Sequence, residues 1–357
     1  MGQQNKSIRI LCIGPPLLTT NIGGAEVLFA KTVEELRTRG FDVRVLHPWF
    51  WFNADGVGIV WLRWLIKALM LLLLCWRVPR HGWRSRLVFL NTAPYPRVPA
   101  SVFVVWTICR LMRRPLAVRF FGGSLGRTYP KSLRRLSRWT WLRSERVYVE
   151  TQQIIGGFPE FADFRWLPNT RDIKPPETGP RDSVRNLVFI SRLDSRKGIY
   201  ELLEACRSLP EQCHLYVYGP PSFGFDMAVF DGHPKATHRS ILDPADVPRV
   251  LSEHDLLLLP TFYPGEGHPG IIVEAFQCHV PVIATMFSAI PEVVQHEENG
   301  LLVEPGSVDS LKAAIDRILN DPELYRRLCV GAKERGEFFR SGPWYDRVAR
   351  DLRSLVA

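Results

Sequence analysis

Two motifs that commonly hold metal ions are absent from this sequence of 357 residues. It contains no Asp-x-Asp pair, and its nine histidines are isolated from one another, so we expect no metal site. Its seven cysteines are dispersed and include no Cys-x-x-Cys pair. An odd, scattered set of cysteines indicates reduced thiols in a cytosolic setting and argues against a zinc site.

Acidic residues are nearly missing from one long stretch of the first half. Residues 56–149 contain 18 Lys/Arg and a single acid, Glu145. Residues 1–175 contain 27 Lys/Arg against 10 Asp/Glu, whereas residues 176–357 contain 19 against 26. The basic half implies an anionic partner. Because its aromatic residues are mostly Trp beside aliphatic side chains, anionic lipid head groups fit better than nucleic acid.

The sequence also lacks an apolar run long enough to cross a bilayer. In residues 57–78, Arg63 and Lys67 interrupt the run and leave about nine uncharged residues, whereas a spanning helix needs about 20. Two interpretations stay open: a buried helix of the first domain, or a helix on the bilayer surface. Both could hold, with one face of the helix directed inward and the other on lipid. A second basic and aromatic helix is expected at residues 131–143. The polar N-terminus does not resemble a signal peptide.

Strand and helix signals alternate along the chain, which indicates an α/β fold with parallel sheets. The expected strands are residues 8–13, 42–46, 86–90, 116–120, 146–150, 186–191, 214–218, 256–259 and 280–285. The length suits two domains better than one core. Residues 171–182 are polar and rich in proline, which is typical of a linker between domains.

Glu266 and Glu274 lie eight residues apart, on either side of the point where a loop rich in Gly and Pro becomes helix-prone. The loop follows a strand-like run at residues 255–260. A strand, a glycine-rich loop and a helix in this order direct free backbone N–H groups and the positive end of the helix at one point, which suits a phosphate. A carboxylate on each side suits hydroxyl groups. The pattern therefore predicts a site for a sugar joined to a nucleotide.

A second basic element runs from Arg192 to Lys197 and ends at Gly198, between a strand and a helix. Moving a sugar from a nucleotide leaves a diphosphate whose charge grows in the transition state. Without a metal, cationic side chains must stabilise that charge. Arg192 can bind two phosphate oxygens through its guanidinium group, while Lys197 acts as a point charge.

These two elements together resemble retaining GT-B glycosyltransferases of family GT4. The Glu-x7-Glu spacing, with Gly267, Pro269 and Gly270 after the first Glu, is similar to the family's donor-site motif. The stretch from Arg192 to Gly198 is similar to its Arg-x4-Lys-Gly element. The resemblance is dense from Asn186 to Leu319 and sparser before it.

The resemblance implies an α/β fold of the GT-B type, with two Rossmann-like domains facing across a cleft. We expect the acceptor-side domain, with its basic, Trp-rich helices facing a membrane, at residues 1–172. We expect the nucleotide-sugar domain at residues 183–337, and a C-terminal helix at residues 338–357 that returns to the first domain.

The same resemblance implies a role for each motif residue. Glu274 binds ribose hydroxyls, Glu266 binds donor-sugar hydroxyls, and Arg192 and Lys197 bind the diphosphate. Glu266, Arg192 and Lys197 are the expected catalytic residues. Further donor contacts are expected at Gly23, Gly24, Gly267, His268, Pro269, Gly270 and Ile271, mainly through the backbone.

The sequence departs from the family pattern near the end of the fourth strand. Many members have a His there that contacts the donor sugar, whereas this chain has Arg119 followed by two Phe. We expect acceptor-side residues in this segment, at Arg119, Gly122, Gly123 and Ser124. The identity of the donor sugar stays open.

The expected activity is retaining, metal-independent transfer of a hexose from a UDP- or GDP-sugar to a lipid-linked saccharide, in surface polysaccharide or glycolipid assembly. No cofactor and no nucleic acid partner are expected. The partners would be a nucleotide-sugar, a saccharide acceptor and an anionic membrane surface, with the protein peripheral on the inner face of the cytoplasmic membrane. Two alternatives are a soluble transferase acting on a small molecule and a catalytically silent membrane-bound scaffold. A GT-B epimerase fits the Arg192 and Lys197 element less well.

Overall fold

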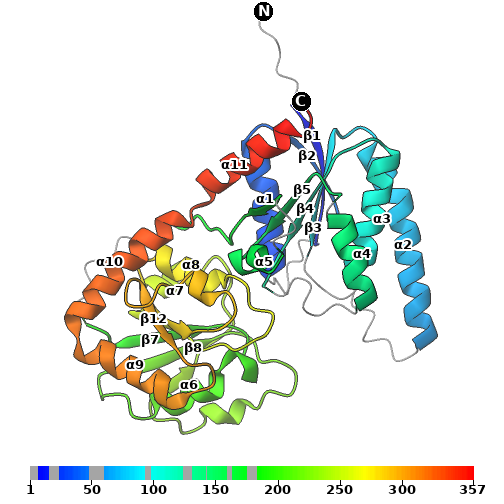
Figure 1. Ribbon diagram of the computed structural model, residues 1–357. Coiled ribbons are helices and arrows are strands. Elements are labelled where there is room, and N and C mark those ends of the chain that lie inside the picture. Colours follow the sequence, from blue (N-terminus) through cyan, green and yellow to red (C-terminus); the bar gives the residue numbers. More distant parts are fainter. Residues whose placement is uncertain are drawn as a thin grey trace, which may run out of the picture. The chain divides into compact units, whose positions relative to one another are not determined.

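The chain folds into two compact units. The computed structural model describes residues 7–15, 24–47, 60–92, 98–123, 131–141, 143–158, 163–174 and 183–357. Unit 1 comprises Met1–Leu167 and Ser341–Ala357, and unit 2 comprises Pro168–Arg340. Each unit has its own parallel sheet covered by helices (Figure 1).

Unit 1 is built on a six-stranded parallel sheet with the order β2-β1-β3-β4-β5-β6. Its strands are β1 Arg9–Ile13, β2 Asp42–Leu46, β3 Leu87–Thr92, β4 Leu116–Phe120, β5 Arg146–Val149 and β6 Phe164–Trp166. Every residue of β3 and of β4 is buried, because helices cover both faces of a parallel sheet. This explains why their sequences are continuous apolar runs.

The helices of unit 1 divide between the two faces of this sheet. They are α1 Gly24–Thr38, α2 Val60–Gly82, α3 Val98–Leu111, α4 Lys131–Trp141, α5 Gln152–Gly157 and α11 Ser341–Ser354. Helices α2, α3 and α4 cover one face, and α1 and α11 cover the other (Figure 1). Successive strand residues alternate between these faces, so Val118 and Phe120 pack on one side and Ala117 on the other.

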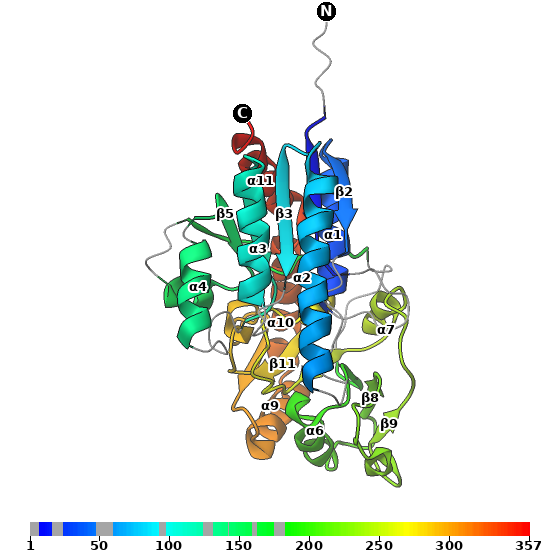
Figure 2. The same cartoon turned by 90° about the vertical axis from the view of Figure 1, so that its right-hand side faces the viewer.

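Helix α2 has one face inside unit 1 and one face exposed. Leu74 and Val78 are buried in the core shared with α3, and Figure 2 shows α2 and α3 side by side in front of β3. Leu72 and Trp76 of the same helix are exposed. The side chains of residues 60–68, including Arg63 and Lys67, lie outside the described part. None of the helices that the structure describes is both long and apolar enough to cross a membrane.

Helix α11 is the expected C-terminal helix, and its place in unit 1 confirms that it returns to the first domain. The hydroxyl group of Tyr345 anchors it to the interior. That hydroxyl lies 2.8 Å from the Thr32 hydroxyl on α1 and accepts a hydrogen bond of 2.6 Å from Arg119 on β4. All three side chains are buried. One buried hydroxyl group therefore ties α11 to both α1 and the sheet.

Unit 2 has a second six-stranded parallel sheet with the order β12-β11-β10-β7-β8-β9. Its strands are β7 Asn186–Ile190, β8 His214–Tyr218, β9 Ala236–His238, β10 Leu256–Leu259, β11 Val282–Thr285 and β12 Gly300–Val303. Its α-helices are α6 Ile199–Cys206, α7 Val247–Ser252, α8 Gly270–Gln277, α9 Val308–Asn320 and α10 Pro322–Phe338, and its short 3₁₀ helices are η3 Ser195–Lys197, η4 Met227–Phe230 and η5 Ile290–Glu292.

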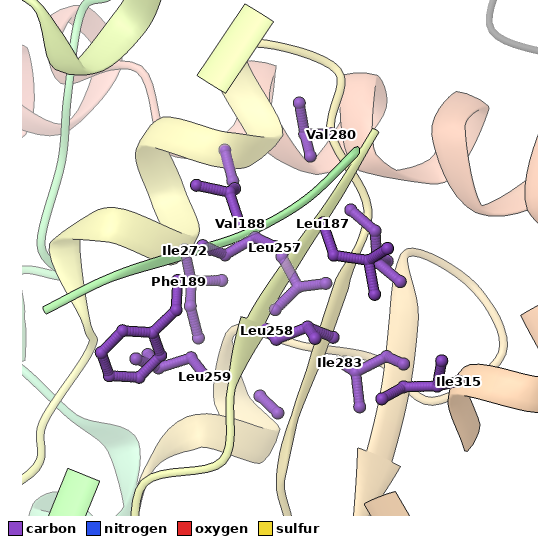
Figure 3. Close-up of a cluster of buried hydrophobic side chains, with 14 of the residues drawn as sticks. Leu187, Val188, Phe189, Leu257, Leu258, Leu259, Ile272, Val280, Ile283 and Ile315 are labelled. Carbon is purple, nitrogen blue, oxygen red and sulfur yellow. The ribbon is translucent and has the colours of Figure 1, made fainter. Parts of the chain in front are cut away.

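The core of unit 2 lies on both faces of its two central strands, β7 and β10. Figure 3 shows Phe189 of β7 and Leu259 of β10 close to Ile272 of α8. All three side chains are at most 1% exposed. Burial of a side chain of this size contributes about 1.5–3 kcal/mol. This packing fixes the positions of β7, β10 and α8 relative to one another. The expected donor residues of unit 2 lie on α8 and in the loops that follow β7 and β10.

The chain crosses from unit 1 to unit 2 between Leu167 and Pro168, and returns between Arg340 and Ser341. Arg171 and Arg340 form a parallel β-bridge inside unit 2. The segment expected to be the linker, residues 171–182, therefore begins inside unit 2, and residues 175–182 lie outside the described part.

Replacing Tyr345 by Phe tests the anchor of α11. The substitution removes the hydroxyl that accepts from Arg119 and leaves a buried donor without that partner, so we expect a loss of about 1–3 kcal/mol in the free energy of unfolding. Asp346→Ala is the matched control on the same helix, because it removes only the exposed ion pair with Arg39, which contributes at most about 1 kcal/mol. Urea unfolding followed by circular dichroism measures both. Equal losses in the two variants would contradict the anchor.

Candidate functional site

Pairing of β7 with β10 brings two distant loops of unit 2 to the same edge of the sheet. Leu187 pairs with Leu256 and Val188 with Leu257 in parallel register. Because the strands run in the same direction, the β7–α6 loop, residues 191–198, and the β10–α8 loop, residues 260–269, leave the sheet side by side. These loops contain the expected donor residues.

The β7–α6 loop is a rigid turn with an exposed arginine at its start. Asp194 caps the turn, since its carboxylate accepts from the Arg196 backbone N–H at 2.9 Å and from the Arg196 side chain. This side-chain hydrogen bond lowers the pKa of Asp194 to about 2, so the carboxylate is ionised at neutral pH. Arg192 is exposed and forms no ion pair with any residue in the described ranges. Its guanidinium group can therefore meet an anion from solvent.

Gly198 ends this turn where no other residue would fit. Its φ of +73° is in the left-handed region, and it is also the residue directly before α6. A Cβ atom on Gly198 would lie 2.2 Å from the Pro260 carbonyl oxygen. The glycine thus lets the β7–α6 loop lie directly against the start of the β10–α8 loop.

Lys197 and Glu266 join the two loops. The Lys197 Nζ atom lies 2.6 Å from Glu266 Oε2, and the two side chains are 19% and 11% exposed. The Thr261 hydroxyl donates to the same carboxylate oxygen at 2.9 Å, and the Ser288 hydroxyl donates to the Glu266 carbonyl at 2.7 Å. The structure therefore brings together two of the predicted residues, 69 positions apart, with the Glu266 side chain held in one orientation.

Several of these supporting side chains were not predicted from the sequence. Thr261 and Ser288 orient Glu266, and Tyr263 places its ring 5.1 Å from Lys197 Nζ and 5.0 Å from the Arg196 guanidinium carbon. Thr261 and Tyr263 lie in the predicted β10–α8 loop, so the sequence indicated that they are near the site but not what they contact. Nothing in the sequence indicated Ser288, which reaches Glu266 from the segment after β11.

Helix α8 begins where the predicted motif placed its start. Pro269 occupies the N-cap position and Gly270 is the first helical residue. The first backbone N–H groups of a helix have no partner within it, and they give this end a partial positive charge. Glu274 follows in the second turn, and its Oε1 atom accepts a hydrogen bond of 2.6 Å from Arg171 Nε. Arg171 was not predicted to be a site residue.

The His268 side chain points into unit 2. Its ring is fully buried, lies 2.9 Å from Glu292 Oε2 through Nε2, and packs edge-on against Phe339. The His268 carbonyl accepts a hydrogen bond of 2.8 Å from the Asn169 amide. A donor could therefore meet only the backbone at this position. Gly267 and Pro269 beside it are also buried, whereas Gly270 and Ile271 are partly exposed.

Two of the residues predicted in unit 1, Gly23 and Ser124, lie outside the described part of the chain. Gly24 is the exposed first residue of α1, and a Cβ atom there would meet nothing within 4 Å. Gly122 has a φ of +82° and donates its N–H to the buried Glu150 carboxylate at 2.8 Å, with Gly123 next to it. A donor role for Gly23 and Gly24 and an acceptor role for Gly122, Gly123 and Ser124 stay predictions.

The acceptor-side role expected for Arg119 is wrong. Its side chain is 0% exposed and lies under α1 and α11, where it donates to Thr32 at 2.7 Å and to Tyr345 at 2.6 Å. Its guanidinium carbon also lies 5.2 Å from the centre of the Phe121 ring. The reason is strand parity: alternate residues of β4 face α11, and Arg119 lies on that face.

Two further features lie apart from these loops. Within the described ranges, no group of three or more His, Cys, Asp or Glu side chains could hold a metal ion. A surface hollow of about 610 Å³ lies between α10 and the segment before β12, lined by residues that include Glu298, Arg327 and Phe338. It shares no residue with either loop.

Comparison with known proteins finds a family match that covers these loops. Residues 170–335 match the family described as "Glycosyl transferases group 1". The matched region contains both loops, α8 and every predicted residue of unit 2.

Two curated relatives are similar to parts of the chain. The amylovoran biosynthesis glycosyltransferase AmsK of Erwinia amylovora is 29% identical over 143 residues, covering 37% of this chain and 35% of that protein. The N-acetyl-alpha-D-glucosaminyl L-malate synthase of Bacillus anthracis is 36% identical over 170 residues, covering 46% of this chain and 44% of that protein. The chain thus spans less than half the length of these relatives.

Solved structures confirm the fold of the chain. Anabaena HepE in complex with UDP superimposes with a TM-score of 0.75 at 19% identity, covering 97% of this chain and 100% of that chain. Together with the two parallel sheets, this likeness confirms the α/β fold of the GT-B type with two Rossmann-like domains.

Replacing Gly198 by Ala tests the contact between the two loops of unit 2. The left-handed backbone costs a non-glycine residue roughly 1–2 kcal/mol, and the clash with the Pro260 carbonyl adds to it, so we expect a total loss of about 3 kcal/mol or more. Gly224→Ala is the matched control, because Gly224 has a similar φ of +79° but open space around it. Urea unfolding measures both variants. Similar losses would show that the close approach at Gly198 contributes nothing.

Proposed function

We propose that this chain is a retaining glycosyltransferase that moves a hexose from a UDP- or GDP-sugar to a lipid-linked saccharide without a metal ion. The observation that carries the proposal is the ion pair between Lys197 and Glu266, beside the exposed Arg192 and the start of α8 in a glycosyltransferase group 1 domain. Each remaining step assigns one part of the donor to one part of this site.

The diphosphate is the part that needs positive charge. Arg192 is exposed and can form two parallel hydrogen bonds to phosphate oxygens. Lys197 carries three N–H donors on its ammonium group, and one contact to Glu266 leaves donors for a phosphate oxygen. The N-terminus of α8 adds backbone N–H groups and a partial positive charge. These groups stabilise the diphosphate as it leaves, when its negative charge is greatest.

One carboxylate of the protein binds the donor sugar and another binds the ribose. Glu266 is oriented by Lys197 and Thr261, so it can accept hydroxyl hydrogen bonds from the donor sugar. Glu274 lies in the second turn of α8 and accepts from ribose hydroxyls. Retention follows if the acceptor oxygen attacks C1 on the side from which the diphosphate leaves. The acceptor proton then passes to the departing phosphate oxygen.

The names of similar proteins support parts of this assignment. HepE is solved with UDP and with UDP-glucose, which supports a uridine diphosphate sugar as the first donor to test. AmsK is named for amylovoran biosynthesis, which supports a saccharide acceptor. The Bacillus anthracis relative is named as the synthase of N-acetyl-alpha-D-glucosaminyl L-malate, and the malate part of that product supports a small acceptor as the second candidate.

Exposed apolar side chains of unit 1 support an acceptor presented at a membrane. Leu69, Leu72, Trp76 and Trp83 are exposed on α2 and just after it, and Trp76 is 60% exposed. The Arg80 guanidinium carbon lies 5.6 Å from the Trp76 ring centre. Trp and Arg side chains arranged in this way are typical of helices that lie in the headgroup region of a bilayer.

Helix α4, on the same face of the sheet as α2, also has exposed basic and aromatic side chains. The Arg143 guanidinium carbon lies 4.4 Å from the centre of the exposed Trp139 ring, and Trp106 of α3 packs against Trp139 at 4.8 Å. Arg135 and Arg138 of α4 are also exposed. These basic and aromatic residues support a peripheral position on the anionic inner face of the cytoplasmic membrane.

Donor hydrolysis tests the assigned chemistry. We expect Lys197→Ala and Glu266→Ala each to reduce the release of UDP from UDP-sugars, or of GDP from GDP-sugars, by about 10²–10³-fold. Each substitution removes a charged side chain of the protein that would face the reacting end of the donor. Arg196→Ala is the matched control: the neighbouring side chain pairs with Asp194 at the surface, so its loss should change the rate by no more than about fivefold. No hydrolysis of any donor by the unmodified protein would favour the silent scaffold.

Vesicle binding tests the membrane surface. The double variant Leu72→Ala, Trp76→Ala removes two exposed apolar side chains, and we expect its partitioning onto phosphatidylglycerol vesicles at low salt to fall about tenfold or more. Phe223→Ala, which removes a fully exposed aromatic residue of unit 2, should leave partitioning unchanged. If the unmodified protein stayed in solution, the membrane part of the proposal would be wrong and the soluble transferase would be favoured.

A further inference from the structure

The segment that enters unit 2 from unit 1 is fastened along helix α8. Near the start of the helix, the Asn169 amide donates to the His268 carbonyl at 2.8 Å. Near its end, the Gln277 side chain donates to the Arg171 carbonyl and accepts from the Ile173 N–H, both at 2.8 Å. Three residues of the crossing segment therefore hold the position of the helix that carries Glu274.

The Arg171 side chain is fixed on more than one side. Its Nε atom donates to Glu274 Oε1 at 2.6 Å, and its Nη1 atom donates to the Thr170 carbonyl at 2.9 Å and to the Asn169 side chain. The Arg171 and Glu274 side chains are only 12% and 19% exposed. An arginine held in this way loses little rotamer freedom when it binds a carboxylate, unlike a flexible surface ion pair.

Gly270 makes room for this arrangement. A Cβ atom at Gly270 would lie 2.2 Å from Arg171 Nη2 and 3.4 Å from Asn169 Nδ2. The first residue of α8 thus has no side chain where the guanidinium group lies. The motif glycine that the sequence assigned to donor binding also creates the space in which Arg171 reaches Glu274.

The contact occupies one oxygen of Glu274. Arg171 donates to Oε1, and no residue in the part of the chain that the structure describes donates to Oε2. The side chain is partly exposed, so a ligand can reach it. A carboxylate fixed through one oxygen presents the other at a defined place, whereas a free carboxylate must lose rotational freedom when a hydroxyl group binds.

We propose that Arg171 is a positioning residue for nucleotide recognition, which holds Glu274 so that Oε2 accepts the hydrogen bonds of the ribose hydroxyls. The inference rests on the proposed function, in which Glu274 binds ribose. It adds a residue from the crossing segment, outside both loops, that sets how strongly the site distinguishes ribose from a sugar without these hydroxyls.

The test compares each nucleotide with an analogue that lacks both ribose hydroxyls. Isothermal titration calorimetry measures the affinity of the full chain for UDP, GDP and ADP and for their 2′,3′-dideoxy analogues. For the nucleotide that binds, the ratio of the two affinities reports recognition of the hydroxyls alone. A variant that is merely damaged loses affinity for both ligands and keeps the ratio.

We expect Arg171→Ala to weaken binding of the ribose nucleotide about three- to tenfold, which corresponds to roughly 0.7–1.4 kcal/mol. Binding of the dideoxy analogue should not change, so the ratio falls towards one. Arg171→Lys should restore part of the ratio, because it keeps a positive charge without the guanidinium geometry. Arg340→Ala is the matched control: Arg340 faces Arg171 in the β-bridge and binds Glu337 and the Ile173 carbonyl, away from Glu274. It should keep the ratio.

Three results would overturn the inference. If Arg171→Ala keeps the ratio, Arg171 has only a structural role. If Arg171→Ala binds the ribose nucleotide more tightly, Arg171 competes with ribose for Glu274. If Glu274→Ala keeps the ratio of the unmodified protein, Glu274 does not bind ribose, and that part of the proposed function is wrong as well. Failure of the unmodified protein to bind any of the three nucleotides would instead overturn the proposed function itself.

Discussion

The parallel pairing of β10 with β7 is the constraint on which the candidate site depends. These strands are far apart in the sequence, yet their carboxyl ends meet because neighbouring parallel strands end at the same edge. The pairing places Lys197 within 2.6 Å of Glu266 and lets Gly198 lie against Pro260. A change of register between the two strands would separate all of these contacts at once, because each is made by a loop that starts at a strand end.

Three carboxylates of unit 2 that lie in or near the candidate site each form an ion pair with a cationic side chain. Glu266 accepts from Lys197, Glu274 accepts from Arg171, and Asp194 accepts from Arg196. Each carboxylate thus has a cationic partner in the absence of a ligand, which avoids the cost of leaving a partly buried charge alone. Arg192 differs, because its side chain is exposed without an ion pair among the described residues. The arrangement leaves one cation ready for an incoming anion and keeps the carboxylates oriented.

Arginine has a different role in the interior of unit 1. Arg119 is fully buried, yet it meets hydroxyl groups and aromatic rings, and the structure shows no carboxylate partner for it among the described residues. Its contact with Tyr345 holds α11 on the sheet. Arg119, which the sequence suggested as a ligand contact, therefore stabilises the packing of α11, a helix more than 200 residues later in the chain.

The sequence alone determined the α/β class, the strands near residues 42–46, 116–120 and 256–259, and the loops that contain Lys197, Glu266 and Glu274, because these follow from local patterns of apolar residues, glycine and charge. It missed the helices α3 and α5 and the strands β6, β9 and β12, whose signals are short or uniformly apolar. Only the tertiary structure decided that Arg119 points inward, that His268 turns away from the loop surface and that Arg171 reaches Glu274. The physical reason is that a local pattern specifies the path of the backbone, whereas the partner of a side chain is set by strand parity and by segments that fold against it from far along the chain.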